Sequence, residues 1–393
     1  MRETFSFFEP TKVIFGAGTL NQLHEQTMPG KKAMIVISDG KSTIANGYLD
    51  RTEAELDQAG VPYEVFNKVN ANPEKKIVEE GARFAREKDC DFVVALGGGS
   101  VLDAAKIMAM LAPQDTDDLW DYAGGITGKG LTPEKDPLPW IAIPTTSGTG
   151  SEVDANGVVT NEETNEKLGL GRLDSLFAKI AIVDPELTYS VPPKFTAFQG
   201  FDALFHSLEC YLGKNACKTS DMVTRTAIEH VGKYLARAVK DGKDKEAREG
   251  MSYASMLGGY AMITSGCAGE HGMEHAMSAF YPNLPHGAGL IMISKEYYRH
   301  FIDIHCCDDK FINMARYLGR QDADKAEDFL TALIDLQKAC GMDTLKMSDY
   351  GIKKEDVVRM AENALATSGR LLQMDPVPMD RDQIIEIYQK SWR

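Results

Sequence analysis

The sequence has few of the features that would bring the protein to a membrane or to nucleic acid. It contains no run of about 18 uninterrupted apolar residues, and its first residues lack the basic and apolar regions of a signal peptide. Positive charge is scarce, because 43 Lys and Arg face 58 Asp and Glu and leave a net charge of -15. The negative electrostatic field of such a protein repels polyanions. We therefore expect a cytosolic protein with no membrane partner and no nucleic-acid partner.

Paired cysteine motifs are also absent. The seven cysteines include no C-x-x-C pair, and an odd, widely spread set fits neither a disulfide framework nor a zinc finger. We interpret them as reduced thiols, and the adjacent Cys306 and Cys307 as small hydrophobic residues rather than a redox or metal site. No internal repeat or low-complexity tract interrupts the 393 residues. A length of this order predicts two to three globular domains.

Short β-rich runs alternate with helical stretches in the first half of the chain. This alternation predicts an α/β fold with a mostly parallel sheet. One helix is expected to begin at Asn72, since Asn can cap a helix and Pro73 suits its first turn. The expected strands are 33–38, 62–66, 91–96, 140–143 and 179–183, with a hairpin at 153–160 and 167–170, and the expected helices are 72–88 and 101–111.

The second half of the chain has a different pattern. After Pro192 and Pro193 proline becomes sparse, and 195–211, 220–240 and 246–265 have helical periodicity. We therefore expect a boundary near Ser190. An α/β domain at 1–190 would precede an all-helical domain at 191–393.

A glycine run lies between a predicted strand and a predicted helix, at Gly97, Gly98, Gly99 and Ser100. Glycines let a phosphate approach the backbone, and the helix N-terminus offers it unpaired N–H groups. The run differs from G-x-G-x-x-G, and a tight turn is the alternative interpretation. Asp39 ends an earlier strand, where a carboxylate can bind ribose hydroxyls and repel a 2′-phosphate. The pattern favours NAD over NADP, although plain turn chemistry also explains an Asp-Gly pair.

A second loop is rich in hydroxyl groups. Residues 144–152 include Thr145, Thr146 and Thr149 together with two serines and two glycines. Such a loop supplies many donors for phosphate, ribose or amide groups. The alternative, a Ser/Thr-rich linker, is disfavoured because the loop lies between two predicted strands rather than at a domain boundary.

The helical half contains a cluster of candidate metal ligands. Asp202 and His206 are four residues apart and so leave the same face of a predicted helix, and His271 and His275 repeat this spacing. His286 follows in a turn-like segment. Three imidazoles and one carboxylate can hold Zn²⁺ or Fe²⁺ and leave room for a substrate oxygen. We interpret the remaining histidines as structural: His24, His230, His300 and His305.

In their order along the chain, these motifs resemble the iron-containing (group III) alcohol dehydrogenase family over essentially the whole length. Within that family the chain is most similar to the butanol dehydrogenase-like branch, through residues 159–167. The resemblance is carried by segments 15–18, 97–100, 144–152, 184–187 and 271–286, by Asp103 and Lys106, and by Asp202 with His206.

The resemblance implies a fold and a set of site residues. The fold is the dehydroquinate synthase-like one, with a dinucleotide-binding domain before a helical metal-binding domain. The metal, Fe²⁺ by family precedent and Zn²⁺ as the alternative, would be bound by Asp202, His206, His271 and His286. Spacing alone does not choose between His271 and His275. The string 271–275 matches the family in the register that makes His271 the ligand and His275 the proton-transfer group.

The resemblance also implies a cofactor site. An acidic residue at position 39 goes with NAD in this family. The residues implied to bind the cofactor are Asp39, Gly97, Gly98, Gly99, Ser100, Asp103, Thr145, Thr146, Thr149, Asn156, Lys167 and Leu187.

The expected activity is hydride transfer between NAD(H) and small primary alcohols or aldehydes, such as butanol and butanal. The sequence does not choose among three substrate classes: these compounds, lactaldehyde with 1,2-propanediol, and glycerol-type polyols. A dehydroquinate synthase-like lyase would require a basic cluster that the sequence does not show. A catalytically silent metal-binding or assembly protein is a further alternative, which the intact cofactor and metal motifs disfavour. We expect a homodimer or a larger homo-oligomer.

Overall fold

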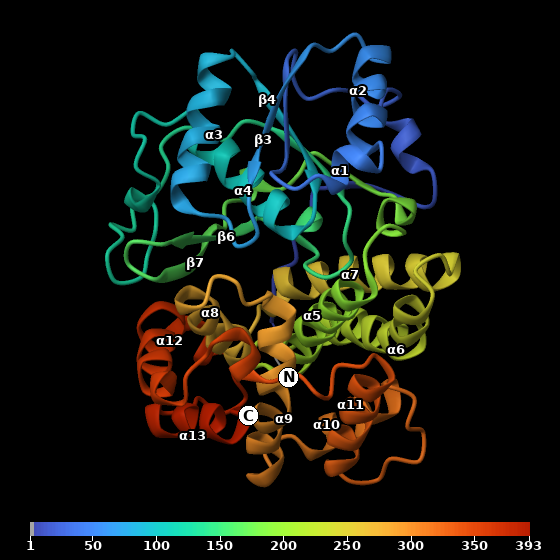
Figure 1. The fold of residues 1–393 in the computed structure, drawn as a ribbon, viewed down its shortest axis with the longest axis vertical. Coiled ribbons are helices and arrows are strands. Elements are labelled where there is room, and N and C mark those ends of the chain that lie inside the picture. Colours follow the sequence, from blue (N-terminus) through green and yellow to red (C-terminus); the bar gives the residue numbers. More distant parts are fainter. Residues whose placement is uncertain (1–3) are drawn as a thin grey trace. The chain divides into compact units, whose positions relative to one another are not determined.

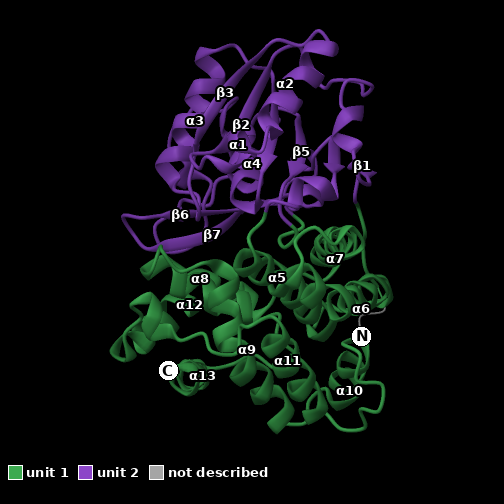
Figure 2. Cartoon of the chain, turned by 45° about the vertical axis from the view of Figure 1, so that its right-hand side comes forward, with its two compact units in different colours: residues 1–8, 147–150, 191–393 green, residues 9–146, 151–190 purple. Residues whose placement is uncertain are grey.

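The computed structural model describes residues 4–393, and these divide into two units, shown in purple and green in Figure 2. The first, here called the sheet unit, comprises residues 9–146 and 151–190. The second, the helical unit, comprises residues up to 8, residues 147–150 and residues 191–393. No helix within the described range is long and apolar enough to cross a membrane.

A six-stranded sheet of parallel pairs forms the centre of the sheet unit, in the order β1-β8-β5-β4-β2-β3. Its central strands are buried along their length, as the apolar runs in the sequence predict for a parallel sheet covered on both faces. The α/β fold class is thus confirmed. The strands are β1 (Lys12–Phe15), β2 (Ala33–Ser38), β3 (Tyr63–Val69), β4 (Phe92–Gly97), β5 (Trp140–Pro144) and β8 (Ile180–Val183).

Helices and a hairpin complete the sheet unit. Helix α4 lies against β4 and beside α3 (Figure 1). The hairpin strands pair antiparallel, and the first begins at Asn156 rather than at 153 because residues 151–153 form a 3₁₀ turn. The elements are α1 (Ser42–Ala45), α2 (Tyr48–Gln58), α3 (Lys75–Glu87), α4 (Gly99–Leu111), β6 (Asn156–Asn161) and β7 (Glu166–Gly171).

The predicted start of α3 at Asn72 is wrong. Asn72 adopts a left-handed backbone with φ of 55°, and Glu74 is the N-cap residue instead. Asparagine tolerates this conformation better than most residues. Asn72 therefore ends the preceding turn, and the helix begins at Lys75.

The helical unit surrounds one helix that is buried on almost all sides. Along α5, nearly every side chain from Thr196 to Leu212 is buried, and α6, α7 and α9 pack against it. A helix buried all round must satisfy its polar side chains inside the protein. The helices are α5 (Pro193–Leu212), α6 (Lys218–Lys240), α7 (Lys245–Thr264), α8 (Gly269–Phe280), α9 (His286–Asp303), α10 (Asp308–Tyr317), α11 (Glu327–Ala339), α12 (Val357–Leu372) and α13 (Arg381–Ser391).

Short 3₁₀ segments connect the longer elements. They are η1 (Thr19–Gln22), η2 (Leu119–Asp121), η3 (Ser151–Val153), η4 (Asp174–Leu176), η5 (Pro185–Thr188), η6 (Met347–Tyr350) and η7 (Lys354–Asp356). Within the described part of the chain, none of the seven cysteines forms a disulfide.

Candidate metal centre and nucleotide loop

One buried carboxylate faces three imidazole rings in the helical unit. Asp202 and His206 lie one turn apart on α5, His271 lies in the first turn of α8, and His286 is the first residue of α9. Asp202 Oδ1 lies 3.6 Å from Nδ1 of His206, 3.4 Å from Nε2 of His271 and 3.5 Å from Nε2 of His286. The four residues that the sequence singled out therefore converge.

Each of the three rings donates a hydrogen bond from Nδ1 to a fixed acceptor. His271 Nδ1 donates to Glu209 at 2.5 Å, and His286 Nδ1 donates to Glu274. His206 Nδ1 lies 3.3 Å from the Gly148 carbonyl oxygen. Hydrogen bonds of this kind orient metal-binding histidines and leave Nε2 as the nitrogen that coordinates the ion. The donor set therefore suits a divalent metal.

Sequence reasoning missed the two carboxylates that orient these rings. Glu209 lies seven residues after Asp202 and three after His206, so the three side chains share one face of α5. Glu274 lies three residues after His271 on α8. Their helical spacing from the predicted ligands was the available indication.

The electrostatics of the centre favour a bound cation. Burial would raise the pKa of Asp202 and of Glu209, but the neighbouring imidazoles outweigh it and hold both pKa values below their ordinary range. Burial lowers the pKa of His206 to about 4. Burial also disfavours the charged form of His271, yet Glu209 and Asp202 raise its pKa to about 10. The ionised carboxylates give this buried site the negative charge that a bound divalent ion requires.

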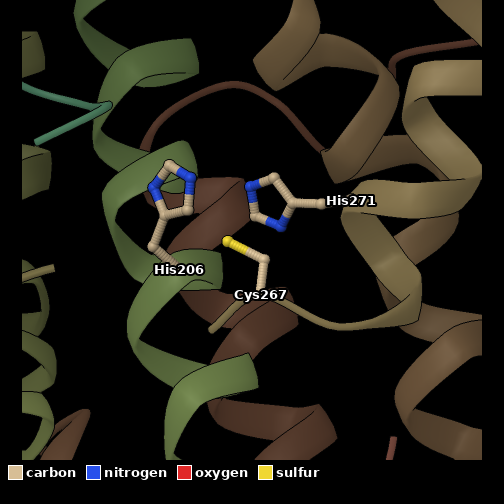
Figure 3. A group of neighbouring side chains, drawn as sticks. All are labelled: His206, Cys267 and His271. Carbon is tan, nitrogen blue, oxygen red and sulfur yellow. The ribbon is translucent and has the colours of Figure 1, made fainter. Parts of the chain in front are cut away.

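The donor atoms form three overlapping groups, in each of which they lie within 4.8 Å of one another. His275 is buried on α8, and its ring centroid lies 5.6 Å from that of His286. Cys267, which sequence reasoning did not place here, lies near His206 and His271 (Figure 3). The groups are Asp202 with His271 and His286, Glu274 with His275 and His286, and His206 with Cys267 and His271.

The glycine run in the sheet unit forms the N-terminus of α4. Gly98 is the N-cap residue and the helix begins at Gly99, two residues earlier than predicted. A Cβ on Gly97 would lie 2.6 Å from the Val101 side chain, and one on Gly98 would lie 3.0 Å from Thr146 Cγ2. Only glycine fits this closely packed turn. The loop leads into a helix N-terminus, whose unpaired N–H groups can bind a phosphate.

Other predicted cofactor residues lie at the same edge of the sheet. The backbone N–H of Thr145 donates to the Gly97 carbonyl oxygen at 2.9 Å, so Thr145 and Thr146 lie beside the glycine loop. Asp39 directly follows β2, which pairs in parallel with β4. Ligands of open α/β sheets bind at the carboxyl ends of the strands. This edge of the sheet can hold a dinucleotide.

The residues near the hairpin have mainly protein partners. Both Asp103 carboxylate oxygens accept hydrogen bonds, from Ser151 Oγ at 2.5 Å and from the Val158 N–H at 2.9 Å. Lys167 lies in β7, and its Nζ donates to Asn72 at 3.0 Å. These contacts tie the hairpin to the rest of the sheet unit. Asn156 is the first residue of β6.

Two further predicted cofactor residues lie elsewhere. The Leu187 side chain is fully buried in the core of the sheet unit. Thr149 belongs to segment 147–150, which groups with the helical unit. The histidines interpreted as structural lie outside the three donor groups among the described residues: His24, His230, His300 and His305.

Comparisons with known proteins agree with this chemistry. The family model described as "Iron-containing alcohol dehydrogenase" matches residues 10–185, and "Fe-containing alcohol dehydrogenase family, C-terminal" matches residues 196–392. The chain is 32% identical to 1,3-propanediol dehydrogenase of Klebsiella pneumoniae over 99% of both chains. It is 30% identical to NADH-dependent butanol dehydrogenase A of Clostridium acetobutylicum, covering 99% of this chain and 100% of the other. The crystal structure of an archaeal Red Sea brine pool alcohol dehydrogenase superposes with a TM-score of 0.93 at 34% identity, covering 100% of both chains.

Proposed function

Because this chain belongs to the iron-containing alcohol dehydrogenase family, we propose that it transfers hydride reversibly between NAD(H) and a small primary alcohol or its aldehyde. The observation that carries the proposal is the buried Asp202 carboxylate facing three imidazoles whose Nδ1 atoms are already engaged. Relatives include NADH-dependent butanol dehydrogenases, which supports both the cofactor and the substrate class.

Four residues hold the metal in this proposal: Asp202, His206, His271 and His286. His271 rather than His275 is assigned as ligand, because the Asp202 carboxylate lies 3.4 Å from His271 Nε2. The family name supports Fe²⁺, and the same donors accept Zn²⁺. When bound, the ion supplies Lewis-acid chemistry at the alcohol or carbonyl oxygen.

His275 transfers the proton in this proposal. It lies one turn after His271 on α8, and an imidazole exchanges protons near neutral pH through its ring nitrogens. The variant His275→Gln is expected to lower turnover and to change its pH profile, whereas the metal content should stay that of the wild type. Unchanged turnover with an unchanged pH profile would exclude this role.

The sheet unit binds the dinucleotide in this proposal. The backbone N–H groups at Gly98 and Gly99 hold the pyrophosphate at the start of α4, and Asp39 accepts hydrogen bonds from the ribose. When bound, NAD(H) supplies or accepts the hydride. The nucleotide domain would span 1–190 and the metal-binding domain 191–393.

The substrate is a small primary alcohol or aldehyde of the butanol and butanal type. A 1,3-diol is the second candidate, because relatives at 32% identity are 1,3-propanediol dehydrogenases. In this proposal the protein acts in the cytoplasm as a homodimer or a larger homo-oligomer.

The first experiment measures NADH and NADPH oxidation by anaerobically purified, Fe²⁺-loaded protein against a panel of short aldehydes, 3-hydroxypropanal included. Rapid NADH oxidation that His206→Ala lacks would support the proposal and rank the substrates. An absence of turnover, despite bound metal and nucleotide, would contradict it.

A further inference from the structure

Cys267 is placed toward two of the proposed metal ligands. It lies in the segment between α7, which ends at Thr264, and α8, which begins at Gly269. Its Sγ and one ring nitrogen each of His206 and His271 lie within 4.8 Å of one another. Figure 3 shows the sulfur facing the space between the two rings, which stack at a centroid distance of 4.3 Å and an angle of 18°.

The neighbouring contacts define which atoms can coordinate an ion there. The Nδ1 atoms of His206 and His271 already face the Gly148 carbonyl and Glu209. Coordination by each ring would therefore be through Nε2, which in His271 also lies 3.4 Å from Asp202 Oδ1. Two imidazole nitrogens and one cysteine sulfur form a donor set that suits Zn²⁺ and related borderline-soft ions.

A second cysteine near the centre has a different arrangement. Cys210 is fully buried on α5, next to Glu209, and its thiol donates to the Gly266 carbonyl oxygen at 3.2 Å. The groups of candidate donors within the described chain include Cys267 and not Cys210. Proximity to the centre alone therefore does not make a cysteine a donor.

We propose that Cys267 is a further metal ligand, which places a thiolate beside His206 and His271, two of the four metal ligands of the proposed function. The proposal rests on the metal centre of the proposed function and extends its ligand set. Cys267 and Asp202 both lie near His206 and His271, so a softer divalent ion is expected closer to the sulfur and a harder one closer to the carboxylate.

Cobalt is the probe, because a cobalt–thiolate bond has an intense near-ultraviolet charge-transfer band that nitrogen and oxygen ligands do not produce. Metal-free protein is titrated anaerobically with Co²⁺, and the stoichiometry is measured alongside the spectrum. The wild type is expected to develop this band together with the weaker visible bands of bound cobalt. In Cys267→Ala and Cys267→Ser the charge-transfer band should be lost while the visible bands remain.

The matched control is Cys210→Ser, which removes a sulfur close to the same centre and keeps a hydroxyl that can donate to Gly266. It should retain the charge-transfer band. A band that persists in Cys267→Ala would overturn the proposal, as would wild-type protein that binds cobalt without the band; in the latter case the metal centre of the proposed function would stand. If the wild type binds no cobalt, both the thiolate ligand and the metal-dependent function fail.

Metal affinity gives a second measurement. Removing the sulfur should weaken Zn²⁺ binding by about tenfold or more and Fe²⁺ binding by less, because thiolates select the softer ion. Competition with a chromophoric chelator measures both affinities in Cys267→Ala and in Cys210→Ser. Equal Zn²⁺ affinity in the wild type and Cys267→Ala would overturn the proposal.

Discussion

Each unit of the molecule contains a buried polar cluster. The two clusters differ in whether protein atoms alone satisfy their charged groups. In the sheet unit, the fully buried Lys106 donates from Nζ to Ser151 Oγ at 3.0 Å, Asp154 at 2.5 Å and the Asn156 carbonyl at 2.7 Å. An ammonium has three donors, so this cation is fully satisfied. In the helical unit, a buried carboxylate faces imidazoles, and the donors converge on one space. The first cluster is a structural joint, whereas the second is the metal centre of the proposed function.

The carboxyl groups show the same contrast. In the sheet unit burial dominates and raises the pKa of Asp103 to about 6 and that of Glu152 to about 7. In the helical unit the pKa values of Asp202 and Glu209 are lowered, although burial opposes this. The difference comes from the number of imidazoles around each carboxylate. Burial alone therefore does not identify a metal ligand, because the charged groups around a carboxylate determine whether its pKa is raised or lowered.

The largest effect is expected for Asp202→Asn, which removes the charge of the metal centre and keeps its shape. Metal binding should be lost, and turnover should fall by about a thousandfold or more, since Lewis-acid assistance contributes several kcal/mol. Metal analysis and NADH oxidation check this. Asp335→Asn, at an exposed position, should change neither. Full metal content and activity in Asp202→Asn would remove the distinction between the two clusters.

Next in size is Lys106→Met, which leaves the partly buried Asp103 and Asp154 without their cation. Breaking such a pair costs about 3–5 kcal/mol of the free energy of unfolding. Denaturant unfolding of the metal-free protein measures the loss. The control Lys129→Met removes a lysine with 65% of its side chain exposed, next to Asp121. It should cost far less than Lys106→Met, because water screens an exposed ion pair. Equal losses in both variants would show that the Lys106 network is not a structural joint.

The sequence predicts those features that depend on periodicity. Strand β2 occupies the predicted residues 33–38, because a strand buried on both faces is a continuous apolar run. Asp202 and His206 were predicted to share a helix face because four residues make about one turn. These two features could be derived without knowledge of the fold.

Features that depend on tertiary contacts could not be predicted from the sequence. Glu209 and Glu274 were missed because a carboxylate on a helix is ordinarily solvent-exposed, and only packing around α5 and α8 buries these two. The position of Cys267 depends on how the chain turns between α7 and α8. The predicted start of α3 was wrong for the same reason, since the left-handed backbone at Asn72 belongs to the preceding turn.

A smaller effect is expected for Glu209→Gln, which weakens the orientation of His271 without removing a ligand. Loss of such a partner typically lowers metal affinity by about 10–100-fold. Competition with a chelator measures the affinity, and Glu249→Gln, an exposed change on α7, should leave it unaltered. If Glu209→Gln binds metal as the wild type does, the carboxylates around the rings do not contribute to the difference between the clusters.

The last effect is a change in pH dependence, expected at Asp375, a buried carboxyl in the helical unit. Burial raises its pKa to about 8, while Oδ1 accepts hydrogen bonds from the Gly269 N–H and the Tyr297 hydroxyl. The folded state therefore holds a proton that the unfolded state releases near pH 4, so the free energy of unfolding falls as pH rises from about 4 to 8. The slope is at most about 1.4 kcal/mol per pH unit.

Asp375→Asn keeps a neutral side chain with an oxygen acceptor for both donors, so its stability should vary less with pH in that window. Denaturant unfolding of both proteins at several pH values between 5 and 8 measures the difference. If the free energy of unfolding changes with pH equally in the wild type and in Asp375→Asn, then Asp375 is ionised in the folded protein. That result would make burial in the helical unit less costly to a carboxylate than in the sheet unit even without imidazoles, and the contrast between the two clusters would then need another cause.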